Sequence, residues 1–222
     1  MHSGADDVKH QEGARAAVTA TEQGAAGRRA PATRDLLYEA AAALFVERGY
    51  EDTTMADIAQ RAGTSRRTAF NHFPSKGDIP MLWTRRMADR AVEVITEATE
   101  EAVPERVRAY FRLISRMVEA EPELSRQMML GWTAAGGPIR YESQLLADLT
   151  PLLRNGQERG EVDPGVDVAE AARTLSDVYT GVIFRWVRDP DTSRTLQTAA
   201  DSAIDLVLSA IRAGGTTPSA PR

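Results

Sequence analysis

The sequence predicts an all-α protein. Apolar residues recur at intervals of three and four along almost every segment between residues 31 and 212, a spacing that places them on one face of a helix. No segment shows the alternation of apolar and polar residues that is typical of a strand. Glycines and prolines separate the periodic segments. We therefore expect a protein of about nine helices.

The first three expected helices lie close together in the sequence. Residues 33–48 form the first, because Thr33 can cap an amphipathic segment there. Shorter helices are expected at 54–61 and 65–72, and Gly63 between them can adopt a left-handed turn. Two short helices at this spacing, braced by an earlier amphipathic helix, are typical of a helix-turn-helix.

The later helices are longer. Ser75 and Asp78 form a capping-box pattern at the start of the fourth, which can run to about residue 102 with Pro80 in its first part. Pro122 suits the first position of a later helix. Beyond the fourth, we expect helices at about 104–120, 122–131, 140–159, 166–188 and 192–212.

Both ends of the chain are expected to lack a fixed structure. Residues 1–30 have almost no large apolar side chain, so burial cannot offset the entropy lost on ordering them. Residues 213–222 contain glycines and prolines that end a helix and prevent another. We expect a disordered arm at 1–30 and a flexible tail at 213–222.

Composition is typical of a soluble globular protein. The chain has 42% hydrophobic and 27% charged residues and no cysteine, which excludes disulfides and thiolate chemistry. It contains neither an apolar run long enough to span a membrane nor a secretory signal. We expect a cytoplasmic protein with no membrane partner.

Positive charge is concentrated in one window. The net charge is -5, yet residues 61–90 hold seven basic and two acidic side chains, whereas residues 91–222 hold 14 basic and 20 acidic. A basic window on an acidic body can attract a polyanion at one end of the molecule.

The stretch from Gly63 to Lys76, "GTSRRTAFNHFPSK", lies inside this window. On a helix begun at Ser65, a polar sector would face outward and an apolar sector, expected to include Phe70, would face the core. Arginine can pair with guanine and asparagine with adenine in the major groove. A solvated basic helix is the alternative, but the preceding helices favour DNA binding. The outward residues are Arg66, Arg67 and Asn71; the inward ones are Ala69, Phe70 and Phe73.

The segment "TTMADIAQRAGTSRRTAFNHFPSKGDI" resembles the N-terminal domain of TetR-type (TetR/AcrR) transcriptional repressors, over about residues 33–80. The resemblance implies that Thr54 caps a helix against a phosphate. Two positions depart from the family: Phe70 stands where a phosphate-binding tyrosine is common, and Ala56 where a longer polar side chain is common. His72 also has an alternative role in the core. The implied DNA-binding residues are Thr54, Thr64, Ser65, Arg66, Arg67, Thr68, Phe70, Asn71, His72 and Lys76, of which Arg66, Arg67, Thr68 and Asn71 face the bases and His72 and Lys76 hold the backbone.

The resulting prediction is a sequence-specific transcriptional regulator, a repressor released from its operator by a small apolar or aromatic ligand. Residues 31–80 would bind DNA and residues 81–212 would bind the ligand and dimerise. The expected partners are a double-stranded DNA operator, a small-molecule effector and a second copy of the chain. An activator of the same family and an all-helical scaffold or ligand carrier without DNA binding remain alternatives.

A homodimer is expected from broad apolar stripes on the last two helices, because paired DNA half-sites require a twofold protein. The alternative is that both stripes pack inside one subunit. The predicted interface residues are Val168, Ala172, Leu175, Val182, Trp186, Leu196, Ala200, Ile204, Val207, Leu208 and Ile211.

Aromatic and methionine side chains are candidates for an apolar ligand pocket, with ordinary core packing as the alternative. They are Phe111, Met117, Met128, Met129, Trp132, Tyr179 and Phe184.

The residue inventory predicts no enzyme. The three histidines, His2, His10 and His72, allow no convincing Ser-His-Asp set, and no phosphate-binding glycine loop or paired zinc-ligand spacing is present. We therefore expect no catalytic residue, cofactor or metal site.

Overall fold

The computed structural model describes residues 32–97, 100–140, 143–189 and 194–212. Internal contacts divide the chain into residues 1–36 and 37–222. From the first unit only residues 32–36, around the start of helix α2, are described. The expected arm at 1–30 and tail at 213–222 lie outside the described residues.

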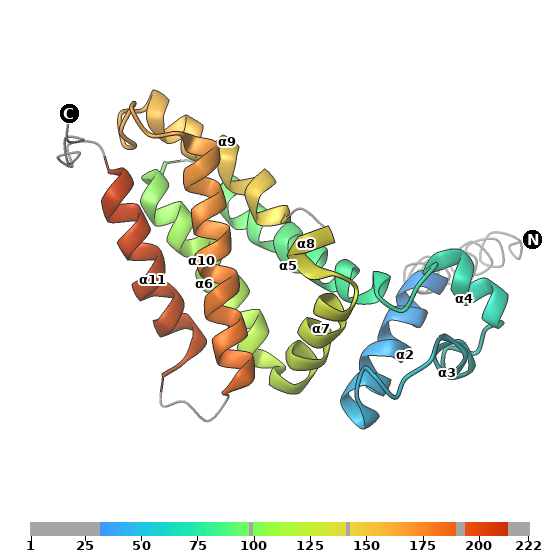
Figure 1. Ribbon diagram of the computed structural model, residues 1–222. Helices are drawn as coiled ribbons and strands as arrows, with labels where there is room; N and C mark the ends of the chain where they lie inside the picture. Colours follow the sequence, from blue (N-terminus) through green and yellow to red (C-terminus); the bar gives the residue numbers. More distant parts are fainter. Residues whose placement is uncertain (1–31, 98–99, 141–142, 190–193, 213–222) are drawn as a thin grey trace, which may run out of the picture. The chain divides into compact units, whose positions relative to one another are not determined.

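The described part of the chain is all-α, as predicted (Figure 1). The nine expected helices are confirmed, and a single turn, α8, is added. Over the described ranges no strand forms, and no helix combines the length and apolar character that a membrane crossing requires. The helices are α2 Thr33–Arg48, α3 Met55–Arg61, α4 Arg66–His72, α5 Asp78–Glu97, α6 Val103–Ala120, α7 Pro122–Ala134, α8 Gly137–Arg140, α9 Gln144–Glu158, α10 Val168–Arg188 and α11 Leu196–Ile211.

The segment from α2 to α4 is organised around a small apolar core. Leu37, Phe45, Ile58 and Phe73 are fully buried in one cluster, and α3 packs against α4. The buried Thr53 hydroxyl donates a hydrogen bond to the carbonyl of Gly49 at 2.8 Å, which closes the turn after α2. This packing leaves the opposite surface of α4 exposed.

The remaining helices form a larger core with an aromatic centre. Helix α5 packs against α6, α7 and α9, and α10 packs against α9 and α11. The Phe111 ring lies 5.4 Å from the ring of Tyr110 and 4.6 Å from that of Tyr179. The two buried phenols are satisfied: Tyr110 donates to Asp148 at 2.7 Å, and Tyr179 shares a 3.0 Å hydrogen bond with Ser115. Burial raises the pKa of both phenols, so both stay protonated.

The predicted dimer residues on the last two helices are mostly buried within their own chain. Helix α11 packs against both α6 and α10, and this three-helix contact covers the apolar stripes. Trp186 and Val207 are only partly buried. The other nine are buried within the single chain, and their contact with a second copy stays a prediction. They are Val168, Ala172, Leu175, Val182, Leu196, Ala200, Ile204, Leu208 and Ile211.

The predicted pocket residues fall into two groups. Phe111, Met128, Met129 and Tyr179 are buried in the core. The partly buried Trp132 and Phe184 stack between α7 and α10, with ring centroids 6.0 Å apart and an interplanar angle of 24°. Met117 is also partly buried.

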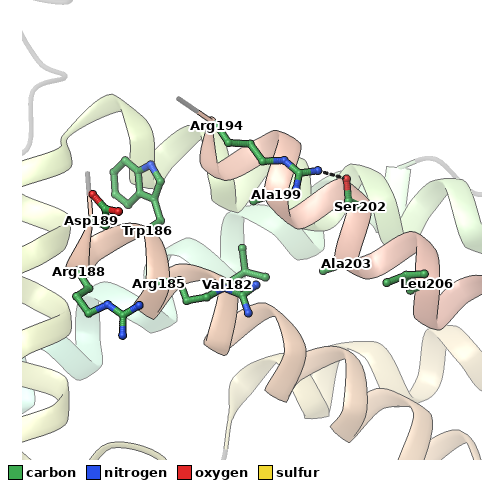
Figure 2. A pocket seen from close by; sticks show the side chains of 10 residues that line it. All are labelled: Val182, Arg185, Trp186, Arg188, Asp189, Arg194, Ala199, Ser202, Ala203 and Leu206. Carbon is green, nitrogen blue, oxygen red and sulfur yellow. Dashed lines mark hydrogen bonds between the residues drawn. The ribbon is translucent and has the colours of Figure 1, made fainter. Parts of the chain in front are cut away.

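A groove of about 510 Å³ lies along α10 and α11, and Figure 2 shows the side chains that line it. None of the seven predicted pocket residues is among them. Two predicted dimer residues, Val182 and Trp186, do line it. The groove thus marks the outer side of the pair α10 and α11, where the side chain of Leu206 is 73% exposed.

Candidate nucleic-acid interface

Helix α3 begins at a complete capping box. The Thr54 hydroxyl accepts a hydrogen bond from the backbone N–H of Asp57 at 3.2 Å, and the Asp57 carboxylate accepts from the Thr54 N–H at 2.9 Å. Arg48 adds an ion pair with the same carboxylate at 2.5 Å. The hydrogen bonds from Thr54 lower the pKa of Asp57, and Arg48 lowers it further. Thr54 is therefore an N-cap, as predicted, and its contact with a phosphate stays a prediction.

Helix α4 begins at Ser65. The Ser65 hydroxyl caps the helix by accepting a hydrogen bond from the Thr68 N–H at 3.0 Å. The same hydroxyl lies 2.8 Å from the Thr68 hydroxyl. Thr64 lies in the turn before it, where its N–H donates to the carbonyl of Ala59 at 2.9 Å. Gly63 has a φ of +67°, the left-handed conformation expected for this turn.

The two faces of α4 differ sharply. Ala69 and Phe73 are fully buried, whereas Arg67 and Asn71 are exposed on the opposite side. Arg67 and Asn71 form no hydrogen bond or ion pair with any residue in the described ranges. His72 is exposed at the last position of α4, which excludes its alternative role in the core. The outer face of this helix thus presents donors and acceptors that the fold does not use.

Phe70 does not face the core, contrary to the sequence-based expectation. Its side chain is 37% exposed, and the Arg66 guanidinium carbon lies 5.5 Å from the centroid of its ring. The buried residues of this segment are Ala69 and Phe73.

Lys76 makes internal contacts rather than projecting outward. Its ammonium group donates to the carbonyl oxygens of Tyr50 at 2.7 Å and Glu51 at 3.2 Å, and it lies 4.1 Å from the centroid of the Tyr50 ring. Partial burial lowers the pKa of Lys76. The side chain therefore ties the start of α5 to the turn after α2, which is a structural role that its place in the sequence did not reveal.

Tyr50 also joins this turn to α7. Its backbone N–H donates to the side-chain oxygen of Gln127 at 2.8 Å, and Gln127 in turn donates to Glu123 at 2.8 Å. The Tyr50 ring packs edge-on against Phe45, with 5.1 Å between centroids. We call this contact between Tyr50 and Gln127 the joint. The sequence did not reveal it, because the two residues are 77 positions apart and neither belongs to a recognisable motif.

Gly131 permits the close approach of α7 to this joint. The sequence predicted that α7 ends here, but the helix continues to Ala134. A Cβ at Gly131 would lie 2.5 Å from a ring carbon of Tyr50 and 2.7 Å from Pro80, closer than atoms can pack. The glycine at position 131 leaves room for the Tyr50 ring and Pro80, and it does not end the helix.

We expect Gly131→Ala to lower the free energy of unfolding by about 1–3 kcal/mol, because the added methyl group overpacks the joint. Urea unfolding followed by circular dichroism measures the change. In a Tyr50→Leu background the same replacement should cost less, since most of the obstructing ring is absent. Equal costs in both backgrounds would contradict the proposed clash.

Comparison with known proteins supports the geometry of the helix-turn-helix. Residues 37–79 match the family described as "Bacterial regulatory proteins, tetR family". The HTH-type transcriptional repressor AcnR of Corynebacterium glutamicum is 25% identical over 190 residues, which cover 85% of this chain and 97% of AcnR.

Two solved structures share the fold. FadR of Thermus thermophilus, a TetR-family repressor solved with lauroyl-CoA, aligns with a TM-score of 0.64 and 23% identity over 85% of this chain and 98% of FadR. SmeT, the repressor of a Stenotrophomonas maltophilia multidrug efflux pump, was solved with triclosan and aligns with a TM-score of 0.61 and 23% identity over 86% and 98% of the two chains. The family match covers residues 37–79, the segment from α2 to the start of α5, and over most of its length the chain is similar to TetR-type transcriptional regulators.

Proposed function

We propose that this transcriptional regulator is a homodimeric repressor that binds a twofold operator and leaves it when a small apolar or aromatic ligand binds. The observation that carries the proposal is the outer face of α4, where Arg67 and Asn71 lie opposite buried Ala69 and Phe73 and have no partner among the described residues. Such a face is suited to the major groove, because arginine and asparagine can bond base edges there.

The proposed DNA contacts divide by position. Arg66, Arg67, Thr68 and Asn71 would face the bases from α4, and Thr54 and His72 would hold phosphates on either side. Thr64 and Ser65 would bring the N-terminal end of α4 close to the backbone. Lys76 would act indirectly, by holding the turn at Tyr50. In this scheme residues 31–80 bind DNA and residues 81–212 dimerise and bind the ligand.

We assign the dimer contact to the outer groove of α10 and α11. Its lining includes Ala199 and Ala203, small residues that allow close helix approach, together with the exposed Leu206. A Cβ on Gly181 of α10 would meet no atom within 4 Å, so the surface there is open to a neighbour. A second copy would cover this face and place two α4 helices in successive major grooves, about 34 Å apart.

The ligand would enter the larger helical part. FadR holds lauroyl-CoA and SmeT holds triclosan, and we extend an apolar ligand from these structures to this chain. Met117, Trp132 and Phe184 are the partly buried members of the predicted lining, and the last two stack on each other. A ligand acts on DNA affinity only by favouring one arrangement over another. Helix α5 is the proposed lever, since it packs against α6, α7 and α9.

The test begins with a random library of duplexes in a cytoplasm-like buffer. The purified full chain selects the duplexes that it binds. The selected duplex should have two related half-sites, and its affinity should fall steeply as salt rises. Lauroyl-CoA and triclosan are the first ligand probes, and release of the duplex would support ligand control. A chain that retains no duplex at low salt would instead be a scaffold or carrier, and increased promoter output on binding would identify an activator.

A further inference from the structure

Phe70 is a large apolar side chain that the fold leaves partly exposed. It is 37% exposed, while Ala69 and Phe73 are fully buried. The exposed part of the ring lies beside the proposed DNA contacts of α4, so it is available to an apolar group of the DNA.

Phe70 lies at one edge of the outward face of α4, which we call the flank. Each residue turns about 100° around a helix axis, so Phe70 lies between the outermost pair, Arg67 and Asn71, and the buried sector. Arg66 shares this flank four positions earlier, and its guanidinium carbon lies 5.5 Å from the centroid of the Phe70 ring. This contact restricts the ring to a limited region of the flank.

The chemistry of the ring limits what it can bind in a groove. Phenylalanine has no hydrogen-bonding group, so it can bond neither a phosphate nor a polar base edge. The apolar group that the major groove presents is the C5-methyl of thymine, and phenylalanine is among the side chains that contact it. This methyl group lies toward the side of the groove formed by its own strand, which a residue on the flank of an inserted helix can reach.

We infer that Phe70 is a specificity residue that reads a thymine methyl group at one position in each half-site, with Arg66 holding its ring in place. The inference rests on the proposed insertion of α4 into the major groove. It adds a defined base preference at one position, which arginine and asparagine contacts do not supply.

Replacement of thymine by deoxyuridine tests the inference, because it removes the methyl group and keeps every hydrogen bond of the base pair. The operator selected from the random library is remade with deoxyuridine at one thymine at a time in both half-sites. At the Phe70 position the wild-type affinity should fall roughly fourfold per half-site, or about 15-fold for the pair, as expected for one methyl group. At thymines elsewhere the affinity should change little.

Variants separate a direct contact from an effect of the methyl group on DNA shape. Phe70→Ala should bind the thymine and deoxyuridine operators equally, whereas Phe70→Tyr, which keeps the ring, should retain the preference. Leu130→Ala, at another exposed apolar residue that lies on α7, should behave as the wild type. The deoxyuridine scan uses the wild-type chain, so it is decisive even if Phe70→Ala does not fold.

Three negative results are possible, and they have different meanings. An operator that binds tightly but shows no position with a preference for thymine over deoxyuridine overturns the inference and leaves the proposed function intact. A preference that persists in Phe70→Ala also overturns it. Failure of the wild-type chain to retain any duplex at low salt removes both the inference and the proposed function.

Discussion

Replacing Arg66 and Arg67 together with alanine is expected to weaken operator binding by roughly 30-fold to 20,000-fold for each half-site, because each bidentate base contact contributes about 1–3 kcal/mol of discrimination. Both side chains are exposed on α4, and neither forms an ion pair within the described residues. The fold should therefore tolerate their loss. Fluorescence anisotropy with the selected operator and with random duplex, at one salt concentration, measures the affinity and the specificity.

A control must remove the same charge elsewhere. Arg154→Ala and Arg173→Ala together also remove two exposed arginines, from α9 and α10, and should leave operator affinity nearly unchanged. If α4 reads bases, the Arg66 and Arg67 variant should lose more affinity for the operator than for random duplex. An equal loss for both duplexes would show that these side chains contact only phosphates. Unchanged binding would exclude α4 as the recognition helix.

Replacing Leu206 with glutamate is expected to convert the dimer into a monomer. Leu206 is 73% exposed and lines the groove of α10 and α11, so in a twofold dimer the new carboxylate would enter the interface twice (Figure 2). Removing the new carboxylate from water costs several kcal/mol, which ion pairs with the arginines that line the groove, such as Arg185 and Arg188, would offset only in part. Sedimentation velocity should show half the wild-type mass, and operator affinity should fall because each monomer holds one half-site.

The control for this prediction is Leu130→Glu, which places the same change at an exposed leucine of α7, outside the groove. That variant should remain dimeric. The circular dichroism spectrum of Leu206→Glu should match that of the wild type, since the side chain is exposed in the single chain. A Leu206→Glu protein that sediments as a dimer would place the interface on another surface.

Local sequence signals determined most of the helices. The sequence offered Thr53 or Thr54 as the cap of α3 and Thr64 or Ser65 as the cap of α4, and the structure selects Thr54 and Ser65. Gly63 provides the turn between the two helices, as predicted. These features depend on hydrogen bonds and backbone angles within three or four residues, so a short stretch of sequence specifies them. The exposure of Arg67 and Asn71 follows in the same way, because helical periodicity sets them opposite Ala69.

The resemblance to a known family predicted the function. The distribution of charge predicted which part of the chain binds DNA. The basic window at 61–90 contains all of α4. The resemblance placed Phe70 among the DNA-binding residues, whereas helical periodicity placed it in the core. The structure leaves Phe70 37% exposed, because the residues that a short helix buries depend on which helices cover it.

Only the tertiary structure decided what each apolar stripe packs against. The stripes of α10 and α11 were evident in the sequence, but a periodic pattern shows that a face is buried and not which partner buries it. Here α11 packs against α6 and α10, and α10 also packs against α9, all within the same chain. The groove beside Leu206 is not covered in the single chain. The joint between Tyr50, Gln127 and Gly131 has the same origin. It is built from residues up to 81 positions apart, and contacts at such separations arise only when the chain has folded.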